Sequence, residues 1–449
     1  MRRAVIVCGM GFGDEGKGAA TEFFTRHTGS GLTVRYSGGP QAGHNVQRAD
    51  GFRHTFSQWG AGTFHGARTH IDRGMIFGPE TLMAEALHLE KGGVKDPLSL
   101  LTVDPECLVV TRYHAWLNRM EELARGGARH GSCGAGVGVC QRLSLLADSL
   151  GLPVIYARDL RDKSGLRSKL RRLREYVHSV APTIPVEVER ANKGWLLPGY
   201  LDADELTDTL HRLGVLQLCY AETPPLADTG VFEGAQGILL DQHYGTAPHN
   251  TWRTVTPSRA AELCADMAPE DVLHVGCVRA VMWRHGAGPF PTECPELSST
   301  LVDRGNMPNA WQGKIRFGWF DMPLFDYAMG VYSMTTGRPI DCLMLSHYDQ
   351  YQKLGARAQW CTHHEREHLS PTLRQVLDMR TRDAIETDAA DFATAFGETV
   401  RTARPVYSNA PLLAALAARH VALITSTGPT LYDRTVHADV EQRLARFTG

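Results

Sequence analysis

Short apolar runs alternate with segments of helical periodicity along the first third of the chain. Wholly apolar runs of four or five residues are typical of strands buried on both faces of a sheet. Their alternation with amphipathic helices is typical of a parallel arrangement. The pattern therefore predicts an α/β fold with a large, mostly parallel β-sheet flanked by helices. The predicted strands are 4–7, 32–36 and 109–110, and the predicted helices are 80–90, 114–124 and one starting near Ala19.

The rest of the chain continues this pattern, interrupted by charged segments. Residues 161–180 are basic and periodic, which predicts a solvated surface helix. Residues 182–198 have the composition of a connection, and 363–391 that of a peripheral excursion. No linker divides the chain, so we expect one domain over 1–449, with peripheral insertions at about 161–200 and 363–391. Further buried strands are predicted at 230–240, 272–281 and 341–346, and a last one at 421–425.

Composition narrows the class of protein. The 449 residues are 43% apolar and 21% charged, and the formal net charge is −2. These values are ordinary for a globular protein and give no sign of a nucleic-acid or membrane surface. No run approaches the roughly 18 apolar residues of a membrane span, and Met1-Arg2-Arg3 does not begin a signal peptide. The ten cysteines form no CxxC pair, so we expect reduced thiols and a cytoplasmic location.

The most informative stretch is the glycine-rich loop GMGFGDEGKG at 9–18. A strand, a glycine loop and a helix start form a common phosphate site, because backbone N–H groups point at the anion. The spacing of Gly and Lys up to Lys17 matches a P-loop, but Gly18 stands where Ser or Thr would bind Mg²⁺. Asp14 and Glu15 lie inside the loop, where a carboxylate is useful if it meets a metal or takes a proton. The alternative is a tight turn with solvated acids.

Three other stretches carry candidate chemistry. His44 ends SGGPQAGH and could give a proton to a phosphate oxygen, although a lone histidine there more often bonds a turn. Gln236 in FEGAQG could read a purine edge or simply close a turn. Lys314 and Arg316 in QGKIRFGWFD could hold carboxylates or phosphates, or belong to a charged surface loop.

Taken together, these stretches resemble the adenylosuccinate synthetase family. The matches are GFGDEGKG, SGGPQAGH, FEGAQGILLD followed by GT, HGAGPFPTE, GWFD and STGP, in the family's order over nearly the whole chain. The resemblance implies a P-loop-related fold, Mg²⁺, GTP or ATP as phosphoryl donor, and a homodimer. It also implies a carbon–nitrogen ligase that phosphorylates the 6-oxo group of a purine nucleotide. The amine of aspartate or a related amino acid then displaces the phosphate.

The resemblance also implies residue roles. Asp14 would take the N1 proton and bind Mg²⁺, with the carbonyl of Gly43 as a further ligand. His44 would polarise or protonate the transferring phosphoryl group, Lys17 would stabilise charge on the γ-phosphate, and Gln236 would orient the purine. The other implied contacts are Gly13, Glu15, Gly16 and Gly18 in the phosphate loop, His347, Asp349, Ser426, Thr427 and Gly428 around the donor nucleotide, and Gln41, Ser132, Cys133, Arg142, Thr251, Lys314 and Arg316 for the other substrates.

Departures from the family pattern cluster on the recognition surfaces. Gln41 replaces an asparagine, and Ser132 to Gly136 replaces Thr-Thr-Gly-Arg-Gly. Ala147 replaces an arginine that reaches across the dimer interface in the family. The loop 310–316 has fewer arginines than the family's amino-acid loop, and His347-Tyr348-Asp349 stands where the family has the Lys-x-Asp that recognises guanine. Because the phosphoryl-transfer residues persist, we predict retained chemistry with shifted specificity. The alternatives are a phosphoryl-activating ligase with an acceptor other than inosine monophosphate, and a non-catalytic nucleotide-binding protein.

Overall fold

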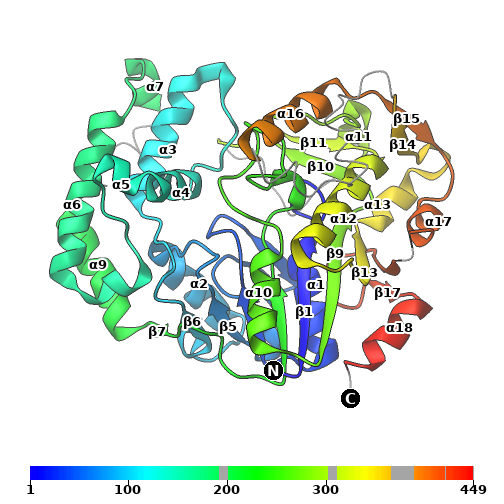
Figure 1. The fold of residues 1–449 in the computed structure, drawn as a ribbon, viewed down its shortest axis with the longest axis horizontal. Helices are drawn as coiled ribbons and strands as arrows, with labels where there is room; N and C mark the ends of the chain where they lie inside the picture. Colours follow the sequence, from blue (N-terminus) through cyan, green and yellow to red (C-terminus); the bar gives the residue numbers. More distant parts are fainter. Residues whose placement is uncertain (192–200, 302–310, 366–388, 420, 448–449) are drawn as a thin grey trace.

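The computed structural model describes residues 1–191, 201–301, 311–365, 389–419 and 421–447. Within these residues the centre of the molecule is a ten-stranded sheet (Figure 1). Every neighbouring pair is parallel except β16 and β17 at one edge, which confirms the predicted mostly parallel sheet. In spatial order the strands are β17 (Arg434–Val436), β16 (Ala422–Ser426), β13 (Cys342–Ser346), β9 (Asp271–Arg279), β1 (Arg3–Gly9), β8 (Thr229–Glu233), β2 (Leu32–Arg35), β5 (Arg68–Ile71), β6 (Leu101–Val103) and β7 (Cys219–Tyr220).

The central strand β1 is apolar from Ala4 to Cys8, and helices cover both faces of the sheet there. Val5 and Val7 of β1 pack in one cluster with α1 (Lys17–Thr28) and α18 (Ala438–Ala445). Ala4 and Ile6 point the other way and pack with α10 (Ser258–Met267). Alternate side chains of a strand face opposite sides, so a strand covered on both sides shows no polar alternation.

Three strand predictions need correction. The strand predicted at 230–240 ends at Glu233, because Gln236 has a positive φ of 59° and the chain turns there. The strand at 421–425 exists as β16 but is not the last, since β17 follows and pairs with it antiparallel. Val109 forms only an isolated bridge with Phe77, so 109–110 is not a strand.

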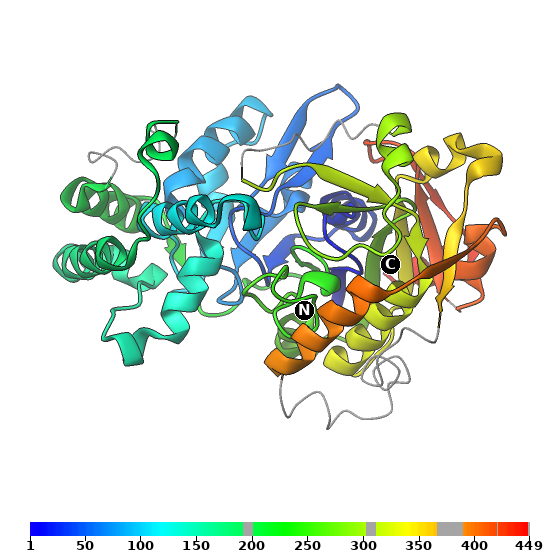
Figure 2. The same cartoon turned by 90° about the horizontal axis from the view of Figure 1, so that it is seen from above.

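A group of helices lies beside the β5–β7 edge of the sheet (Figures 1 and 2). In the basic helix α6 (Lys163–Val180), Leu166, Leu170, Leu173 and Val177 are all buried. The helix predicted to be a solvated surface element is therefore solvated on one face and packed on the other. The other members are α2 (Pro79–Lys91), α3 (Arg112–Arg125), α4 (Val137–Leu145), α5 (Ala147–Leu150), α7 (Val186–Ala191) and α9 (Ala203–Leu216).

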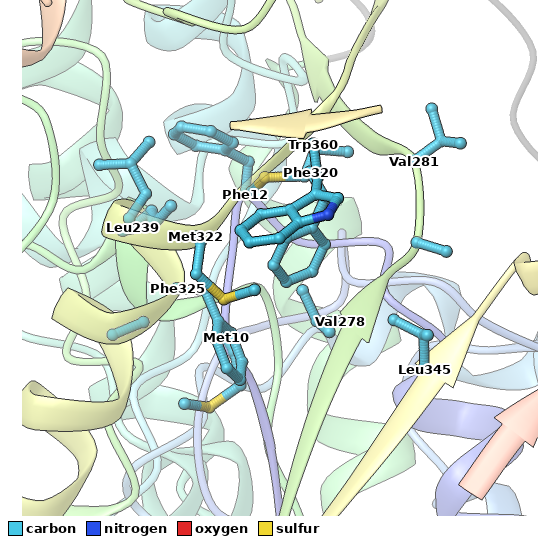
Figure 3. Close-up of a cluster of buried hydrophobic side chains, with 14 of the residues drawn as sticks. Met10, Phe12, Leu239, Val278, Val281, Phe320, Met322, Phe325, Leu345 and Trp360 are labelled. Atoms are coloured by element: carbon cyan, nitrogen blue, oxygen red, sulfur yellow. The ribbon is translucent and has the colours of Figure 1, made fainter. Parts of the chain in front are cut away.

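Three small sheets lie at the carboxyl ends of the central strands. They are β3 (His44–Gln47) with β4 (Arg53–Phe56), β10 (Met282–His285) with β11 (Ile315–Gly318), and β12 (Phe320–Asp321) with β14 (Trp360–His364) and β15 (Pro405–Ser408). The cluster in Figure 3 joins Met10 and Phe12 of the glycine loop to Phe320, Met322 and Trp360. The helices on this side are α11 (Pro295–Thr300), α12 (Met322–Thr336), α13 (Tyr348–Lys353), α16 (Ala389–Thr402) and α17 (Leu412–Ala417).

The two predicted insertions are only partly described. Of the connection 182–198, residues 186–191 form α7 and 192–198 lie outside the described residues. Of the excursion 363–391, His363 and His364 belong to β14, α16 begins at Ala389, and 366–388 lie outside. Among the described helices, none has the length and apolarity that a membrane span requires.

The start of α3 yields a pH prediction. His114 is buried and its Nδ1 accepts the backbone N–H of Thr111 at 3.0 Å, and burial lowers the pKa of His114 to about 3. The unfolded chain therefore binds an extra proton below about pH 6.5, and stability falls with falling pH by up to about 1.4 kcal/mol per pH unit. We expect His114→Asn to reduce the loss of unfolding free energy between pH 7 and pH 5, measured by urea titration. Equal losses in both proteins would contradict this.

Candidate functional site

The glycine loop lies where the carboxyl ends of β1, β8, β9 and β2 meet. Asp14 follows β1, Gln236 follows β8, and His44 follows β2 after a short loop. Arg279 ends β9, and its Nε donates to the main-chain oxygen of Asp14 at 2.7 Å. Ligands of open α/β sheets bind at this edge, so the residues predicted from separate motifs share one location.

The loop presents a helix start without a side-chain cap. Gly16 precedes α1 with φ 86°, and no side chain caps the first turn, so its backbone N–H groups remain available to an anion. A Cβ at Gly18 would lie 2.7 Å from the Cβ of His44. The Ser or Thr of an ordinary P-loop therefore cannot stand at this position, because His44 occupies its place. Lys17 is buried beside the loop.

The two loop acids have different environments. The Asp14 side chain is 36% exposed and its backbone is left-handed, with φ 54°. Glu15 is buried, and its carboxyl oxygens fill the space that a Cβ at Gly9 or Gly11 would need. Burial raises the pKa of Glu15 to about 8. Asp14 is therefore the acid that a substrate can reach, while Glu15 supports the loop from beneath.

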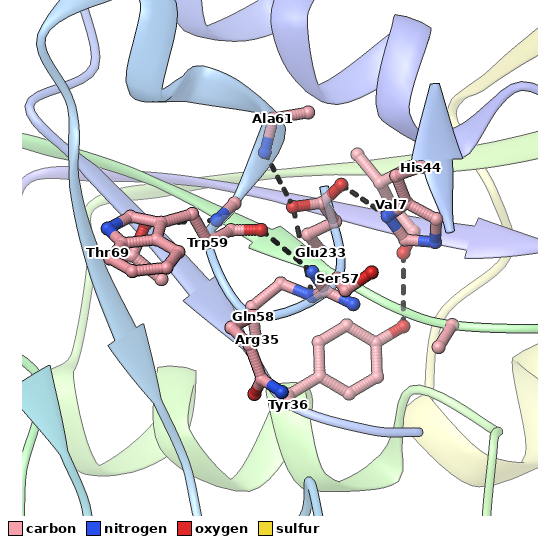
Figure 4. Close-up of polar contacts among 12 residues, drawn as sticks. Val7, Arg35, Tyr36, His44, Ser57, Gln58, Trp59, Ala61, Thr69 and Glu233 are labelled. Carbon is pink, nitrogen blue, oxygen red and sulfur yellow. Dashed lines mark hydrogen bonds and ion pairs between the residues drawn. The ribbon is translucent and has the colours of Figure 1, made fainter. Parts of the chain in front are cut away.

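His44 is held by a buried carboxylate (Figure 4). Its Nδ1 lies 2.5 Å from Oε1 of Glu233, and Oε2 of Glu233 accepts the backbone N–H of Ala61 at 3.0 Å. The Nε of Arg35 lies 3.9 Å from the same Oε2. Glu233 was not predicted as a site residue, although it lies three residues before Gln236 in FEGAQG. Its partner is 189 residues away, so no local pattern indicated the pair.

The charges within this cluster follow from burial and contact. Burial lowers the pKa of His44, opposed by the charge of Glu233. Although burial alone would raise the pKa of Glu233, the charges of His44 and Arg35 outweigh it and lower that pKa. Glu233 is therefore ionised, and His44 donates its Nδ1–H to the carboxylate. Nε2 of His44 is then the nitrogen left for a substrate.

Several buried polar atoms at the site have no hydrogen-bond partner among the described residues. Among them are Nε2 of His44, Oε1 of Gln236 and Oε1 of Gln41. Buried polar groups are normally paired, so these unpaired atoms, on the segments that follow the central strands, fit a polar ligand. The same three residues were predicted to contact substrates. All three atoms can accept hydrogen bonds, so they suit a ligand that carries N–H or O–H groups.

The predicted donor-nucleotide residues lie at the ends of β13 and β16. His347 has φ 56°, and Nε2 of His347 accepts a hydrogen bond from Arg279 at 2.9 Å. The carboxylate of Asp349 pairs with Lys353 at 2.9 Å and is partly exposed. Ser426 ends β16, and Thr427 and Gly428 follow it; the Thr427 hydroxyl donates to the backbone oxygen of Asp433. A base bound here would meet Asp349 and the imidazole of His347.

The predicted acceptor loop, residues 132–136, contains no cation, and hydrogen bonds from neighbouring residues hold it in place. Asn118 donates to the Ser132 hydroxyl at 2.9 Å, and Arg119 donates to the backbone oxygen of Gly134. Cys133 lies half-buried in the same loop, and burial raises the pKa of its thiol. Arg142 pairs with Glu121 on α3. The backbone N–H of Thr251 donates to the backbone oxygen of Leu240.

On the predicted amino-acid loop, the two cations have different environments. Arg316 donates to Glu293 at 2.7 Å and to the backbone oxygens of Gly286 and Gly288. Its guanidinium is thus already engaged within the protein. Lys314 is exposed beside it. Ala310 of this loop lies outside the described residues.

A separate buried group, Asp321, Cys361 and His364, has the residue types of a metal site. Oδ1 of Asp321 accepts the N–H of Leu324 at the start of α12, and Oδ2 lies 3.0 Å from Nε2 of His364. The Cys361 thiol donates to the backbone oxygen of His363, and burial raises its pKa above the usual range. The protein thus satisfies each group, and the arrangement anchors α12 on β14.

The sequence matches a known protein family and its curated members. The sequence model of the adenylosuccinate synthetase family matches residues 6–383. The adenylosuccinate synthetase of Alkalilimnicola ehrlichii is 33% identical over 329 residues, covering 72% of each chain. That of Neisseria gonorrhoeae is 30% identical over 336 residues, again covering 72% of each chain.

Solved structures share the fold at lower sequence identity. The fully ligated adenylosuccinate synthetase of Plasmodium falciparum is 18% identical, with a TM-score of 0.67, and the match covers 96% of this chain and 99% of that one. The succinoaminodeoxyadenylate synthetase of cyanophage S-2L, bound to dGMP and dATP as an energy donor, is 18% identical, with a TM-score of 0.54 over 100% and 99% of the chains. On the extent of the family match and the identity to its curated members, the chain belongs to the adenylosuccinate synthetase family of carbon–nitrogen ligases.

Proposed function

We propose that the protein uses a nucleoside triphosphate to phosphorylate the 6-oxo group of a purine nucleotide, and then joins the amine of aspartate or a related amino acid to that carbon. The main support for this proposal is that Nε2 of His44 and Oε1 of Gln236 are buried beside the glycine loop and have no hydrogen-bond partner among the described residues. A purine N–H or amino group is a partner that Oε1 of Gln236 can accept from, and a phosphoryl oxygen is a partner for Nε2 of His44 once the imidazole is protonated.

The first step needs a base for the N1 proton, an acid at the transferring phosphoryl group and positive charge beside the triphosphate. Asp14, the reachable carboxylate of the loop, takes the N1 proton, so that the 6-oxygen becomes nucleophilic. Lys17 and the uncapped N–H groups of α1 stabilise the negative charge on the triphosphate. His44 faces the transferring group with Nε2. The negative charge of bound phosphates favours the imidazolium, which Glu233 stabilises from the other side.

The second step is a displacement. A 6-oxo oxygen is a poor leaving group, whereas a phosphoryl ester leaves readily, so the amine can form the new carbon–nitrogen bond. The amine nitrogen bonds to C6 and loses a proton, the carbon–oxygen bond breaks, and inorganic phosphate leaves with the electron pair and takes up that proton. Gln236 holds the purine edge during both steps.

Asp14 and the carbonyl of Gly43 would hold Mg²⁺. The partly exposed carboxylate of Asp14 and a main-chain oxygen are hard oxygen donors that suit this ion. When bound, the ion supplies positive charge against the triphosphate. No hydroxyl of the loop contributes, because His44 fills the space beside Gly18.

Specificity is proposed to differ from that of other family members. The loop Ser132 to Gly136 offers hydroxyl, thiol and backbone groups but no cation of its own, and Arg316 is engaged within the protein. A charged hydrogen bond to a carboxylate or phosphate contributes about 1.5–3 kcal/mol, so its loss changes which substrate binds best. The related cyanophage enzyme was solved with dGMP and dATP, which makes deoxynucleotides and ATP natural members of a substrate panel.

The reaction itself is the first test. Phosphate release should require Mg²⁺, a triphosphate, an oxo-purine nucleotide and an amine donor together, as measured across GTP, ATP, ribo- and deoxynucleotides and several amino acids. No release from any combination would refute the proposal. Tight calorimetric binding of inosine or guanosine monophosphates would argue against the alternative, a ligase for a non-nucleotide acceptor.

Asp14→Asn should abolish turnover, because the amide cannot take the N1 proton. Loss of a general base typically costs about 10²–10⁴-fold in rate. Asp14 is partly exposed, so the melting temperature should change little. Retention of wild-type turnover in a folded Asp14→Asn protein would exclude its assigned role.

Glu233→Gln tests the support of His44. The amide can keep the bond to Ala61 but cannot stabilise an imidazolium, so we expect kcat to fall at least about tenfold. Glu85→Gln is the matched control, since Glu85 also accepts buried backbone N–H groups, from Ser57, Gln58 and Trp59, while the carboxylate that holds the His44 imidazole is that of Glu233. Similar losses in the two variants would show that general destabilisation, rather than His44, explains the effect.

A further inference from the structure

His285 lies between the phosphate loop, proposed for the first step, and β11, which carries the predicted amino-acid site. It is the last residue of β10, and Oδ2 of Asp14 lies 3.6 Å from its Nε2. The backbone of His285 pairs with Ile315 of β11, the residue after Lys314. His285 therefore joins the acid of the phosphate loop, which faces its ring, to the strand predicted to bind the amino acid, which pairs with its backbone.

The position of this ring is built into the protein. The ring of Trp283 meets the ring of His285 edge-on, with centroids 5.0 Å apart. Nε1 of Trp283 donates to the backbone oxygen of Gly13, and the guanidinium of Arg279 lies 4.0 Å over the Trp283 ring. These contacts tie β10 to the phosphate loop, so His285 keeps its place relative to Asp14.

The backbone ties β10 to β11 on the other side of the ring. The N–H of Gly286 donates to the oxygen of Lys314 at 3.2 Å, and Arg316 donates to the oxygen of Gly286 at 2.9 Å. Because the guanidinium of Arg316 is engaged in these and other protein contacts, it offers less to a substrate than the sequence suggested. The side chain of His285 is 17% exposed, whereas that of His44 is 6% exposed. A substrate can therefore reach His285.

We propose that His285 is a substrate-contacting residue that holds the amine donor beside the phosphorylated carbon. A neutral imidazole has one nitrogen that donates and one that accepts a hydrogen bond, so it can accept an amine N–H, which lysine and arginine cannot do. The residue would therefore act in the displacement step and not in phosphoryl transfer. This inference rests on the proposed function.

The test separates the two steps. With an oxygen isotope label in the β–γ bridge of the triphosphate, reversible phosphorylation of the purine nucleotide scrambles the label without any amine donor. Product formation with the donor reports both steps. In His285→Ala we expect scrambling within about twofold of wild type and kcat/KM for the amine donor about tenfold lower. His285→Gln, whose amide can still accept and donate, should recover part of the loss.

The controls make each outcome decisive. His363→Ala removes an exposed imidazole of β14, and it should leave both measurements unchanged. Equal losses of scrambling and product formation in both folded His285 variants would overturn the inference, since the residue would then act in phosphoryl transfer. Unchanged kcat/KM for the amine donor would overturn it as well. Absence of scrambling and of product in the wild-type protein would instead refute the proposed function, and the inference with it.

Discussion

The site depends on one buried carboxylate. Glu233 ends a central strand and joins His44, Arg35 and the backbone of Ala61 beneath the phosphate loop. An ionised group without partners is costly to bury, and here two cationic or hydrogen-bonding side chains and a main-chain N–H offset that cost. Since His44 donates Nδ1–H to this carboxylate, its Nε2 is the nitrogen left for the proposed substrate. The orientation of this imidazole thus follows from the interior of the sheet.

The glycine loop is shaped by the same histidine. An ordinary P-loop places a hydroxyl after its lysine, but here a side chain at Gly18 would collide with His44. The loop therefore has no metal-binding hydroxyl at this position, and His44 fills the space where that side chain would lie. Asp14, strained into a left-handed conformation, supplies the reachable acid instead. Backbone strain of this kind is often concentrated at functional sites.

The recognition surfaces differ from this centre in how their charges are used. Arg142 pairs with Glu121, Arg316 with Glu293, and Asp349 with Lys353. Groups expected to meet substrates thus have partners within the chain. Binding would have to exchange these contacts or use the neutral groups beside them. A ligase with an unchanged phosphoryl-transfer centre and altered recognition surfaces is consistent with this pattern.

The sequence by itself determined the fold class and the strand and loop around Asp14, and it predicted roles for His44 and Gln236. Apolar runs report burial on both faces, and the glycine motifs report local backbone shape, so both can be interpreted without coordinates. Only the tertiary structure decided that Glu233 supports His44, that Arg316 is engaged by Glu293, and that His285 faces Asp14. Those contacts join strands far apart in the chain. Their distances depend on packing and register, which periodicity does not encode.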